Sequence, residues 1–347
     1  MLSRWSGIFQ IAAVYVGTVV GAGFATGKEI VEFFTRYGFY GFIGILIAGY
    51  IFIFTGTKIM LISARIRASS YEEFNQFLFG KKIAGIINIF FLIMLLGVTA
   101  VMISGSGAVF EEQLGVPKSI GSWSTIILAS LVLMMGMRGV FTVNSFVVPI
   151  MICFSLILFF STLGNGEFFK NLTKVPDEVI TLKMILSPFA YTAFNLALAQ
   201  AVLVPVAYEV RDEKVIKHGA ILGGIFLTII LLTGHFSLMT LPDVNNYEIP
   251  SAVIMRTAAS QLYWMFILVI YGEIFTSVIG NIYGLQRQIS SYIKMPSMLI
   301  IAVIFLIALI ISEFGYGRLL GYIYPVFGYI SLLFLMLVWK SKGGKEK

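Results

Sequence analysis

The chain has 347 residues, of which 59% are hydrophobic and only 12% charged, with a formal net charge of +7. Soluble domains average roughly 45–50% apolar and about 25% charged residues. A water-soluble protein of this size could not bury so much apolar surface, so composition excludes a cytosolic enzyme, a disordered protein and a disulfide-stapled secreted domain. It predicts a polytopic membrane protein whose basic residues contact membrane lipid rather than nucleic acid.

Long uncharged runs follow one another along the chain and predict about ten transmembrane helices, since a bilayer core needs roughly 20 apolar residues per helix. None shows the period of two that transmembrane strands would have. The first run is expected to remain a helix, because cleaving it as a signal peptide would leave only further membrane helices. The runs are 5–27, 37–57, 83–110, 119–137, 139–166, 184–208, 219–242, 257–286 (interrupted by Glu273), 295–312 and 319–339.

The distribution of basic residues predicts the orientation. With ten spans, most of the 24 Lys and Arg residues fall on the same side as both termini. Because cytoplasmic loops are enriched in Lys and Arg, both termini are expected to be cytoplasmic, in a multi-pass protein of the cell membrane. The two longer outside loops, 167–183 and 243–256, are each expected to carry a short interfacial helix.

The whole chain, 1–347, is predicted to be one transmembrane domain built from two similar halves, 8–163 and 184–340. Glycine-interrupted or short spans at matching places in two halves indicate a transporter site. In the first span, glycines recur from Gly17 to Gly27 and are followed by Lys28 and Glu29, which predicts a broken helix. Close packing of small residues, as in a G-x-x-x-G spacing of Gly17 and Gly21, is the alternative.

The first span of the second half contains Pro188 and Pro205 with Asn195 between them. Proline removes a backbone donor, so this pattern predicts a second broken helix, the sixth span; a simple proline kink is the alternative. Backbone groups freed at a break must line a cavity. The amides of Gly21, Ala22 and Gly23, at the start of a half-helix, would suit a substrate carboxylate.

The stretch Gly21-Ala22-Gly23-Phe24-Ala25-Thr26-Gly27-Lys28-Glu29 resembles the signature of the YkvI-like amino acid permeases, a family of the amino acid–polyamine–organocation (APC) superfamily. The stretch 189–195 is similar to the sixth-helix motif of that superfamily, as is Glu209 before a charged loop. By helix count the resemblance covers essentially the whole chain. It implies an all-α LeuT-type fold with a five-plus-five inverted repeat, and says less about the substrate.

The resemblance also implies a cation site. In LeuT-type sodium symporters one sodium ion lies between the first and eighth helices. Aligned on the glycine break, the oxygen donors here would be the carbonyls of Gly17, Val20 and Glu273 and the hydroxyls of Thr276 and Ser277. Such a set suits a hard cation, whereas ordinary interhelical hydrogen bonding is the alternative for the two hydroxyls.

Ionisable residues within spans are functional candidates. Glu273 could add charge to a sodium site, carry the proton of a proton-coupled carrier, or pair with Lys28. Lys28, Glu29 and Glu32 are expected at the outer vestibule or gate, with a structural pair between Lys28 and Glu32 as the alternative.

Four further side chains are considered for the substrate. Tyr191, Phe194 and Asn195 are expected to contact it. Ser106, in a run of small residues, would either leave room for it or permit close helix packing.

These features predict a secondary transporter, coupled to Na⁺ or H⁺, that moves an amino acid or similar small amine or carboxylate by alternating access. The rival is an amino-acid sensor of the germinant-receptor type that does not transport. The chain has no nucleotide-binding motif and no common catalytic motif, so neither an ATP-driven pump nor an enzyme is expected. No cofactor beyond a bound Na⁺ is expected, and the oligomeric state is left open.

Overall fold

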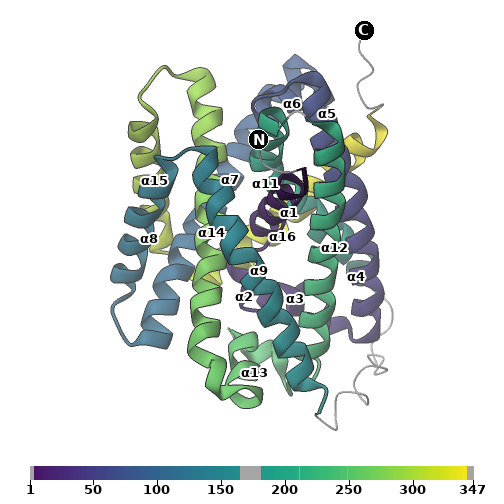
Figure 1. The fold of residues 1–347 in the computed structure, drawn as a ribbon, viewed down its shortest axis with the longest axis vertical. Helices are drawn as coiled ribbons and strands as arrows, with labels where there is room; N and C mark the ends of the chain where they lie inside the picture. Colours follow the sequence, from purple (N-terminus) through teal and green to yellow (C-terminus); the bar gives the residue numbers. More distant parts are fainter. Residues whose placement is uncertain (1–3, 165–180, 211, 248, 342–347) are drawn as a thin grey trace.

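The computed structural model describes residues 4–164, 181–210, 212–247 and 249–341, which fold into a bundle of helices (Figure 1). Most of the outside loop 167–183 lies outside these residues. The longer helices are α1 (Arg4–Val19), α4 (Phe39–Ile51), α5 (Thr57–Ile66), α7 (Lys81–Leu114), α8 (Lys118–Leu133), α9 (Met137–Thr162), α11 (Leu182–Val210), α12 (Glu213–Leu238), α14 (Tyr263–Tyr292), α15 (Ser297–Ser312) and α16 (Tyr316–Lys340). The short ones are α2 (Ala22–Ala25), α3 (Lys28–Phe33), α6 (Tyr71–Phe79) and α13 (Pro250–Ala258), which lies in the loop 243–256.

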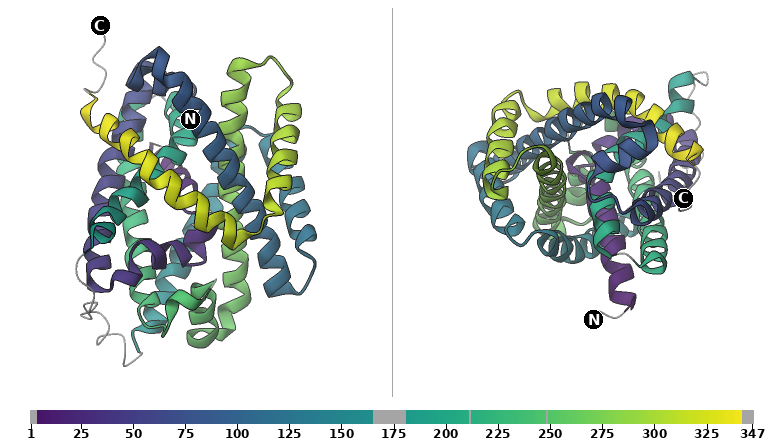
Figure 2. Two further views of the ribbon diagram at one scale, coloured as in Figure 1. Left: turned by 180° about the vertical axis from the view of Figure 1, so that it is seen from behind. Right: turned by 90° about the horizontal axis from the view of Figure 1, so that it is seen from above.

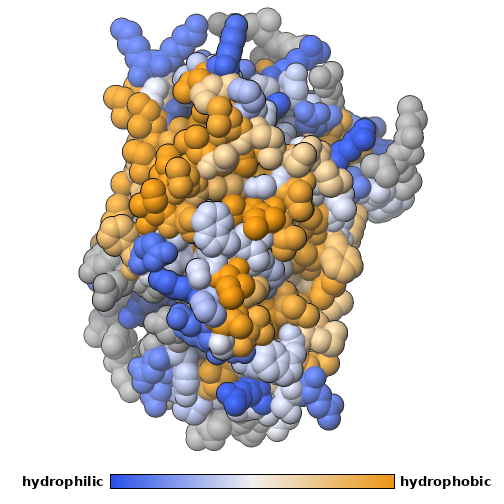
Figure 3. Space-filling view, turned by 90° about the vertical axis from the view of Figure 1, so that its left-hand side faces the viewer, coloured by the Kyte–Doolittle hydropathy of each residue, from blue (hydrophilic) through white to orange (hydrophobic). Residues whose placement is uncertain are grey.

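The helices suit a membrane environment. Within the described residues, six helices are long and apolar enough to cross a bilayer, and three more apolar helices are shorter. Large apolar side chains such as Ile86, Phe146 and Leu268 are at least 70% exposed. Figure 3 shows apolar side chains in a broad band across one face, with hydrophilic ones gathered toward the two ends. A surface of this kind fits lipid contact, so the chain is a multi-pass membrane protein.

The centre of the bundle is formed by α1 and α11. In α11, 94% of the most apolar stretch is buried. α1 packs closely on α12 because that helix presents two glycines to it. A Cβ added to Gly219 would lie 2.6 Å from the Ile11 Cβ, and one added to Gly223 would lie 2.8 Å from the Tyr15 ring. α16 crosses the back of the bundle at a steep tilt (Figure 2).

The first span is divided into three helical pieces. α1 ends at Val19, Val20 and Gly21 belong to no helix, and the short helices α2 and α3 follow. Gly27 separates α2 from α3 with φ of 84°, a backbone conformation that a residue with a Cβ adopts at a cost. Glycine therefore permits the sharp change of direction after the interruption.

The prediction of a broken sixth span is wrong: α11 runs without interruption from Leu182 to Val210, with both prolines inside it. Side chains one turn further on bond to carbonyls near the first proline. The Thr192 hydroxyl donates to the carbonyl of Pro188 (2.8 Å), and the Asn195 amide donates to that of Tyr191 (3.0 Å). The helix continues through both prolines in a stretch that is almost entirely buried among neighbouring helices, which tolerate such interruptions of the hydrogen bonding.

The second irregular segment lies elsewhere, in a π-helix at Phe52–Gly56 between α4 and α5. The Tyr15 hydroxyl donates to the carbonyl of Phe52 (2.7 Å). A Cβ on Gly56 would overlap the Tyr15 hydroxyl, so a glycine is required where the two spans meet. A widened turn of this kind leaves carbonyls for partners from another helix.

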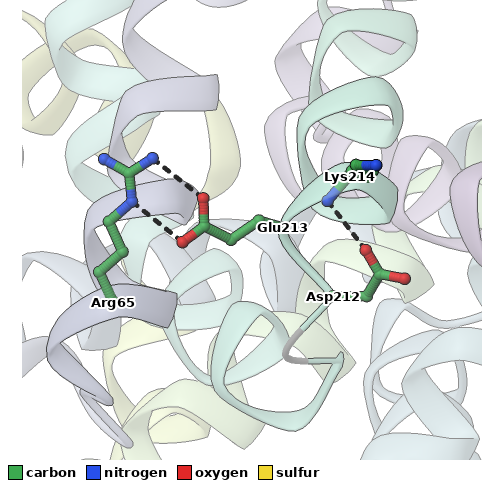
Figure 4. A network of polar contacts seen from close by, with 4 residues as sticks. All are labelled: Arg65, Asp212, Glu213 and Lys214. Carbon is green, nitrogen blue, oxygen red and sulfur yellow. Dashed lines mark hydrogen bonds and ion pairs between the residues drawn. The ribbon is translucent and has the colours of Figure 1, made fainter.

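One end of α12 is fixed by two polar contacts (Figure 4). Arg65 of α5 binds Glu213 through two bonds of 3.0 and 2.9 Å. Asp212 caps the helix, because its Oδ1 accepts from the backbone N–H groups of Lys214 (2.9 Å) and Val215 (3.2 Å). These donors, with Val215 contributing most, hold the pKa of Asp212 below its usual value.

We expect Asp212→Ala to lower the melting temperature of the purified protein by a few degrees, because the first turn of α12 loses its cap. Asp212→Asn keeps a cap without the charge. The folded pKa of Asp212 lies below the unfolded value of about 3.9, so the charge-dependent stabilisation is complete above that pH and disappears as pH falls through the folded value. Differential scanning fluorimetry from pH 7 to 3 should show the melting temperature of wild type falling toward that of Asp212→Asn. A difference in melting temperature that stays constant over this range would contradict the explanation.

Candidate functional site

The interruption of the first span lies directly against α14. The Ser277 hydroxyl donates to the carbonyl of Val20 (2.7 Å). The Thr276 hydroxyl lies 3.3 Å from the carbonyl of Gly17 and 2.9 Å from that of Glu273. The structure therefore gathers the predicted oxygen donors in one place, and we call them the oxygen cluster: the carbonyls of Gly17, Val20 and Glu273 and the hydroxyls of Thr276 and Ser277.

The oxygen cluster forms because the last carbonyls of a helix have no partner within it. α1 ends at Val19, and the buried hydroxyls of Thr276 and Ser277 supply donors from the neighbouring helix. A hydroxyl has lone pairs as well as a proton, so it can turn and present its oxygen to a cation. Carbonyl and hydroxyl oxygens without any nitrogen or sulfur are ligands that hard cations accept.

Asn144 of α9 is a polar neighbour of the cluster that the sequence prediction missed. Its amide oxygen is buried without a hydrogen-bond partner, and a Cβ on Gly17 would overlap it. The side-chain nitrogen is used, donating to the carbonyl of Val140 (2.8 Å). A lone amide in an apolar run is a detectable signal, since polar groups within spans usually face the bundle interior.

Both carboxyl oxygens of Glu273 are buried and have no hydrogen-bond partner. The alternative that Glu273 pairs with Lys28 is therefore wrong. The Nζ of Lys28 instead donates to the carbonyl of Tyr247 in the loop before α13 (2.8 Å). An unpartnered buried carboxyl is energetically costly, which marks Glu273 as a group that a cation or a proton would stabilise.

A small, partly open cavity adjoins the oxygen cluster. Its volume of about 20 Å³ is enough for one water molecule. Gly21 and Ser277 border both the cavity and the cluster. The lining residues are Thr18, Val19, Gly21, Glu29, Val98, Met102, Phe194, Asn195, Leu198, Ser277, Asn281 and Tyr324.

The cavity contains three of the residues expected to contact substrate, namely Gly21, Phe194 and Asn195. The sequence prediction missed Asn281 and Tyr324. The ring of Tyr324 lies 4.6 Å from that of Phe194, centroid to centroid. Both had a local signal: Asn281 is an amide in an apolar span next to Gly280, and Tyr324 directly precedes Pro325.

Glu29 lies in this cavity rather than at an outer gate. Its side chain is only 3% exposed and folds back over Gly23. A Cβ on Gly23 would overlap the carboxyl group and lie 2.6 Å from the Glu29 Cγ. The protein's own carboxyl thus lies over one of the three residues whose amides were expected to bind a substrate carboxylate.

The other charged residues after the interruption face away from the cavity. Glu32 pairs with Arg36 at 2.5 Å on an exposed surface. Close to Lys28, the backbone N–H of Ser251 at the start of α13 donates to the carbonyl of Thr26 (3.0 Å). α13 is thereby attached to the end of α2.

Three expected substrate residues, Gly23, Ser106 and Tyr191, do not line the cavity in the structure. Ser106 donates to its own helix at Ile103 (2.7 Å), and a Cβ on Gly121 of α8 would lie 2.7 Å from its carbonyl, so the structure favours close packing there. Tyr191 is buried among the rings of Phe33, Phe34 and Phe52. Ala22 opens α2, but its side chain lies outside the described part of the chain.

Comparison with known proteins finds a relative of high identity and solved structures of similar fold. No protein-family model matches the chain. It is 51% identical over 340 residues to the membrane protein YkvI of Bacillus subtilis (strain 168), covering 97% of each chain. A Na⁺-coupled sialic acid symporter is similar in structure with a TM-score of 0.64 at 13% identity, over 96% of this chain and 77% of the symporter. Mhp1, a nucleobase-cation-symport-1 family transporter, is similar in structure with a TM-score of 0.57 at 10% identity, over 92% of this chain and 77% of Mhp1. The fold is therefore that of LeuT-type transporters.

Proposed function

The chain belongs to the family of the membrane protein YkvI, and from this premise we propose that it is a cation-coupled secondary transporter of a small amine or amino acid. The observation that carries the proposal is the oxygen cluster, where hydroxyls of α14 meet carbonyls at the interruption of the first span. Its oxygens suit Na⁺. The fold it shares with two cation symporters supports the same conclusion by analogy.

The proposed mechanism is alternating access between two similar halves, 8–163 and 184–340, around the cavity beside the cluster. With both termini cytoplasmic, the end of the bundle that carries α6 faces the cytoplasm and the end with α13 faces outside (Figure 1). The contacts of α13 with Thr26 and of Tyr247 with Lys28 then close the outer side. Na⁺ binding between α1 and α14 would stabilise one arrangement of the two helices over the other.

Flux measurements on the purified full-length protein in liposomes test this function. We expect an inward Na⁺ gradient to accumulate a substrate above its equilibrium level, and an equal K⁺ gradient to fail, because K⁺ is larger than the ion the cluster suits. Ligand binding without flux under any ion gradient would refute transport and favour the sensor.

A second candidate is proton coupling, which the partnerless carboxyl of Glu273 favours. Glu273→Gln keeps the shape of the side chain but cannot release a proton. Under proton coupling this variant should lose uptake driven by a pH gradient. Under sodium coupling it should retain uptake driven by Na⁺, although with a weaker dependence on the ion.

A further inference from the structure

Among the described residues, the buried interior of this protein holds carboxyl groups but no Lys or Arg side chain. The two carboxyls found there belong to Glu29 and Glu273. The three ion pairs of the described residues all lie on exposed surfaces and include neither carboxyl. Buried charges are stable only when they are paired, bind a cation or are neutralised by a proton.

The two carboxyls lie at different places. Glu273 belongs to the helix that forms the oxygen cluster and would be balanced there by an inorganic cation or a proton. Glu29 lines the adjoining cavity instead, opposite residues of quite different chemistry. Unless a proton neutralises Glu29, the positive charge that balances its carboxylate has to come from whatever enters the cavity.

The remaining walls of the cavity fit an organic cation. Phe194 and Tyr324 present a pair of aromatic rings, which attract ammonium groups through their π faces. Asn195 and Asn281 add amide groups for hydrogen bonds, while Met102 and Leu198 give apolar contact. Within the described residues no basic side chain lines the cavity, so nothing of that kind is available to bind a carboxylate there.

Resting on the proposed transport function, we propose that the substrate is a small organic cation, an amine or ammonium compound without a carboxylate, whose positive group binds the Glu29 carboxylate. The place expected for a substrate carboxylate, at the amides of 21–23, is where the Glu29 carboxyl folds over Gly23. A second carboxylate there would be repelled by the first. Zwitterionic amino acids are therefore poor ligands.

Matched ligand pairs test the charge requirement on the wild-type protein. Ethanolamine and glycine share a primary ammonium group, and choline and glycine betaine share a trimethylammonium group; each pair differs in hydroxyl against carboxylate. We expect titration calorimetry of the purified full-length protein in Na⁺ to show at least one hydroxyl compound binding tenfold or more tightly than its carboxylate partner. Equal or tighter binding of the carboxylate compounds, or no binding of either cation, would overturn the proposal.

The variant Glu29→Gln tests the residue. It should weaken binding of the preferred cation at least tenfold, because a buried charge-assisted bond is lost. The control Glu313→Gln removes an exposed carboxylate, paired with Lys118 at 3.0 Å, and should bind as wild type. If Glu29→Gln binds the cation normally and loses only its response to pH, Glu29 is a proton carrier and the assignment is wrong. If the variant does not fold, the ligand pairs on wild type still decide.

These outcomes separate the two proposals. Sodium-driven uptake of glycine without binding of choline or ethanolamine would leave the transport function standing and refute the cationic substrate. Binding of a cation that never crosses the liposome membrane under any ion gradient would support the cavity assignment and refute transport.

Discussion

Replacing Thr276 and Ser277 together with alanine should weaken the Na⁺ response of the protein about a hundredfold. The substitution removes both hydroxyls of the oxygen cluster and leaves only backbone carbonyls. A hydrogen bond or ligand contact to a charged group contributes roughly 1.5–3 kcal/mol, so losing two costs about 3 kcal/mol or more. The measurement is the concentration of Na⁺, against a constant total of Na⁺ plus K⁺, that gives half-maximal thermal stabilisation.

Controls for the double substitution separate ion binding from packing. Thr276→Ser with Ser277→Thr keeps both hydroxyls and should retain the Na⁺ response. Ser130→Ala removes a hydroxyl of α8 that bonds to its own helix at Ile126 (2.8 Å) and should change nothing. A double alanine variant with the wild-type Na⁺ response would refute the assigned cation site.

Gly23→Ala should abolish substrate binding while the protein still folds. A new Cβ would overlap the Glu29 carboxyl and approach its Cδ to 2.9 Å. The atoms in the way run from Cγ to the carboxyl of Glu29, so the whole side chain has to rotate away, at a cost of about 1–3 kcal/mol in the free energy of unfolding. The displaced carboxyl would then no longer face the cavity. Liposome uptake, and calorimetry with the ligand identified for wild type, should both show a loss greater than tenfold.

Gly85→Ala provides the matched control for this substitution. Gly85 lies in α7 with nothing within 4 Å of an added Cβ. Alanine there is expected to be neutral or to stabilise the helix by up to about 1 kcal/mol. The Na⁺ response of Gly23→Ala should also be recorded. Gly23 is remote from Thr276 in sequence, but it lies close to the interruption of the first span, where the oxygen cluster is. If Gly23→Ala transports normally, the cavity is not the substrate site.

The positions of the oxygen cluster could be predicted from a local signal in one segment and from the family resemblance in the other. The glycine-rich stretch after Gly17 marks a place where helical hydrogen bonding fails, whereas Thr276 and Ser277 are one of three adjacent hydroxyl pairs in the apolar runs. Knowledge of the family's fold then brought the two segments together. Tyr324 directly precedes Pro325, but that signal does not tell where α16 lies, and the residue reaches the cavity because α16 crosses behind the bundle (Figure 2).

Two predictions, for the sixth span and for Glu29, failed because they depend on contacts between distant parts of the chain. The sixth span was expected to break at its prolines, but the helix continues through both, buried among its neighbours. Glu29 was placed at a gate because it follows the glycines. Its true position depends on the turn at Gly27 and on the missing side chain of Gly23, which together let α3 fold back toward the cavity. Both effects arise from three-dimensional contacts rather than from composition.

The glycine contact between α1 and α12 has a mechanical consequence. Two helices that meet almost backbone to backbone, at Gly219 and Gly223, leave no side-chain layer that could slide or rearrange between them. In the proposed transport cycle we therefore expect α1 and α12 to move together as one rigid unit, with the chain bending at Val20 and Gly21. The oxygen cluster joins the end of α1 to α14, so an ion bound there would hold that unit against α14.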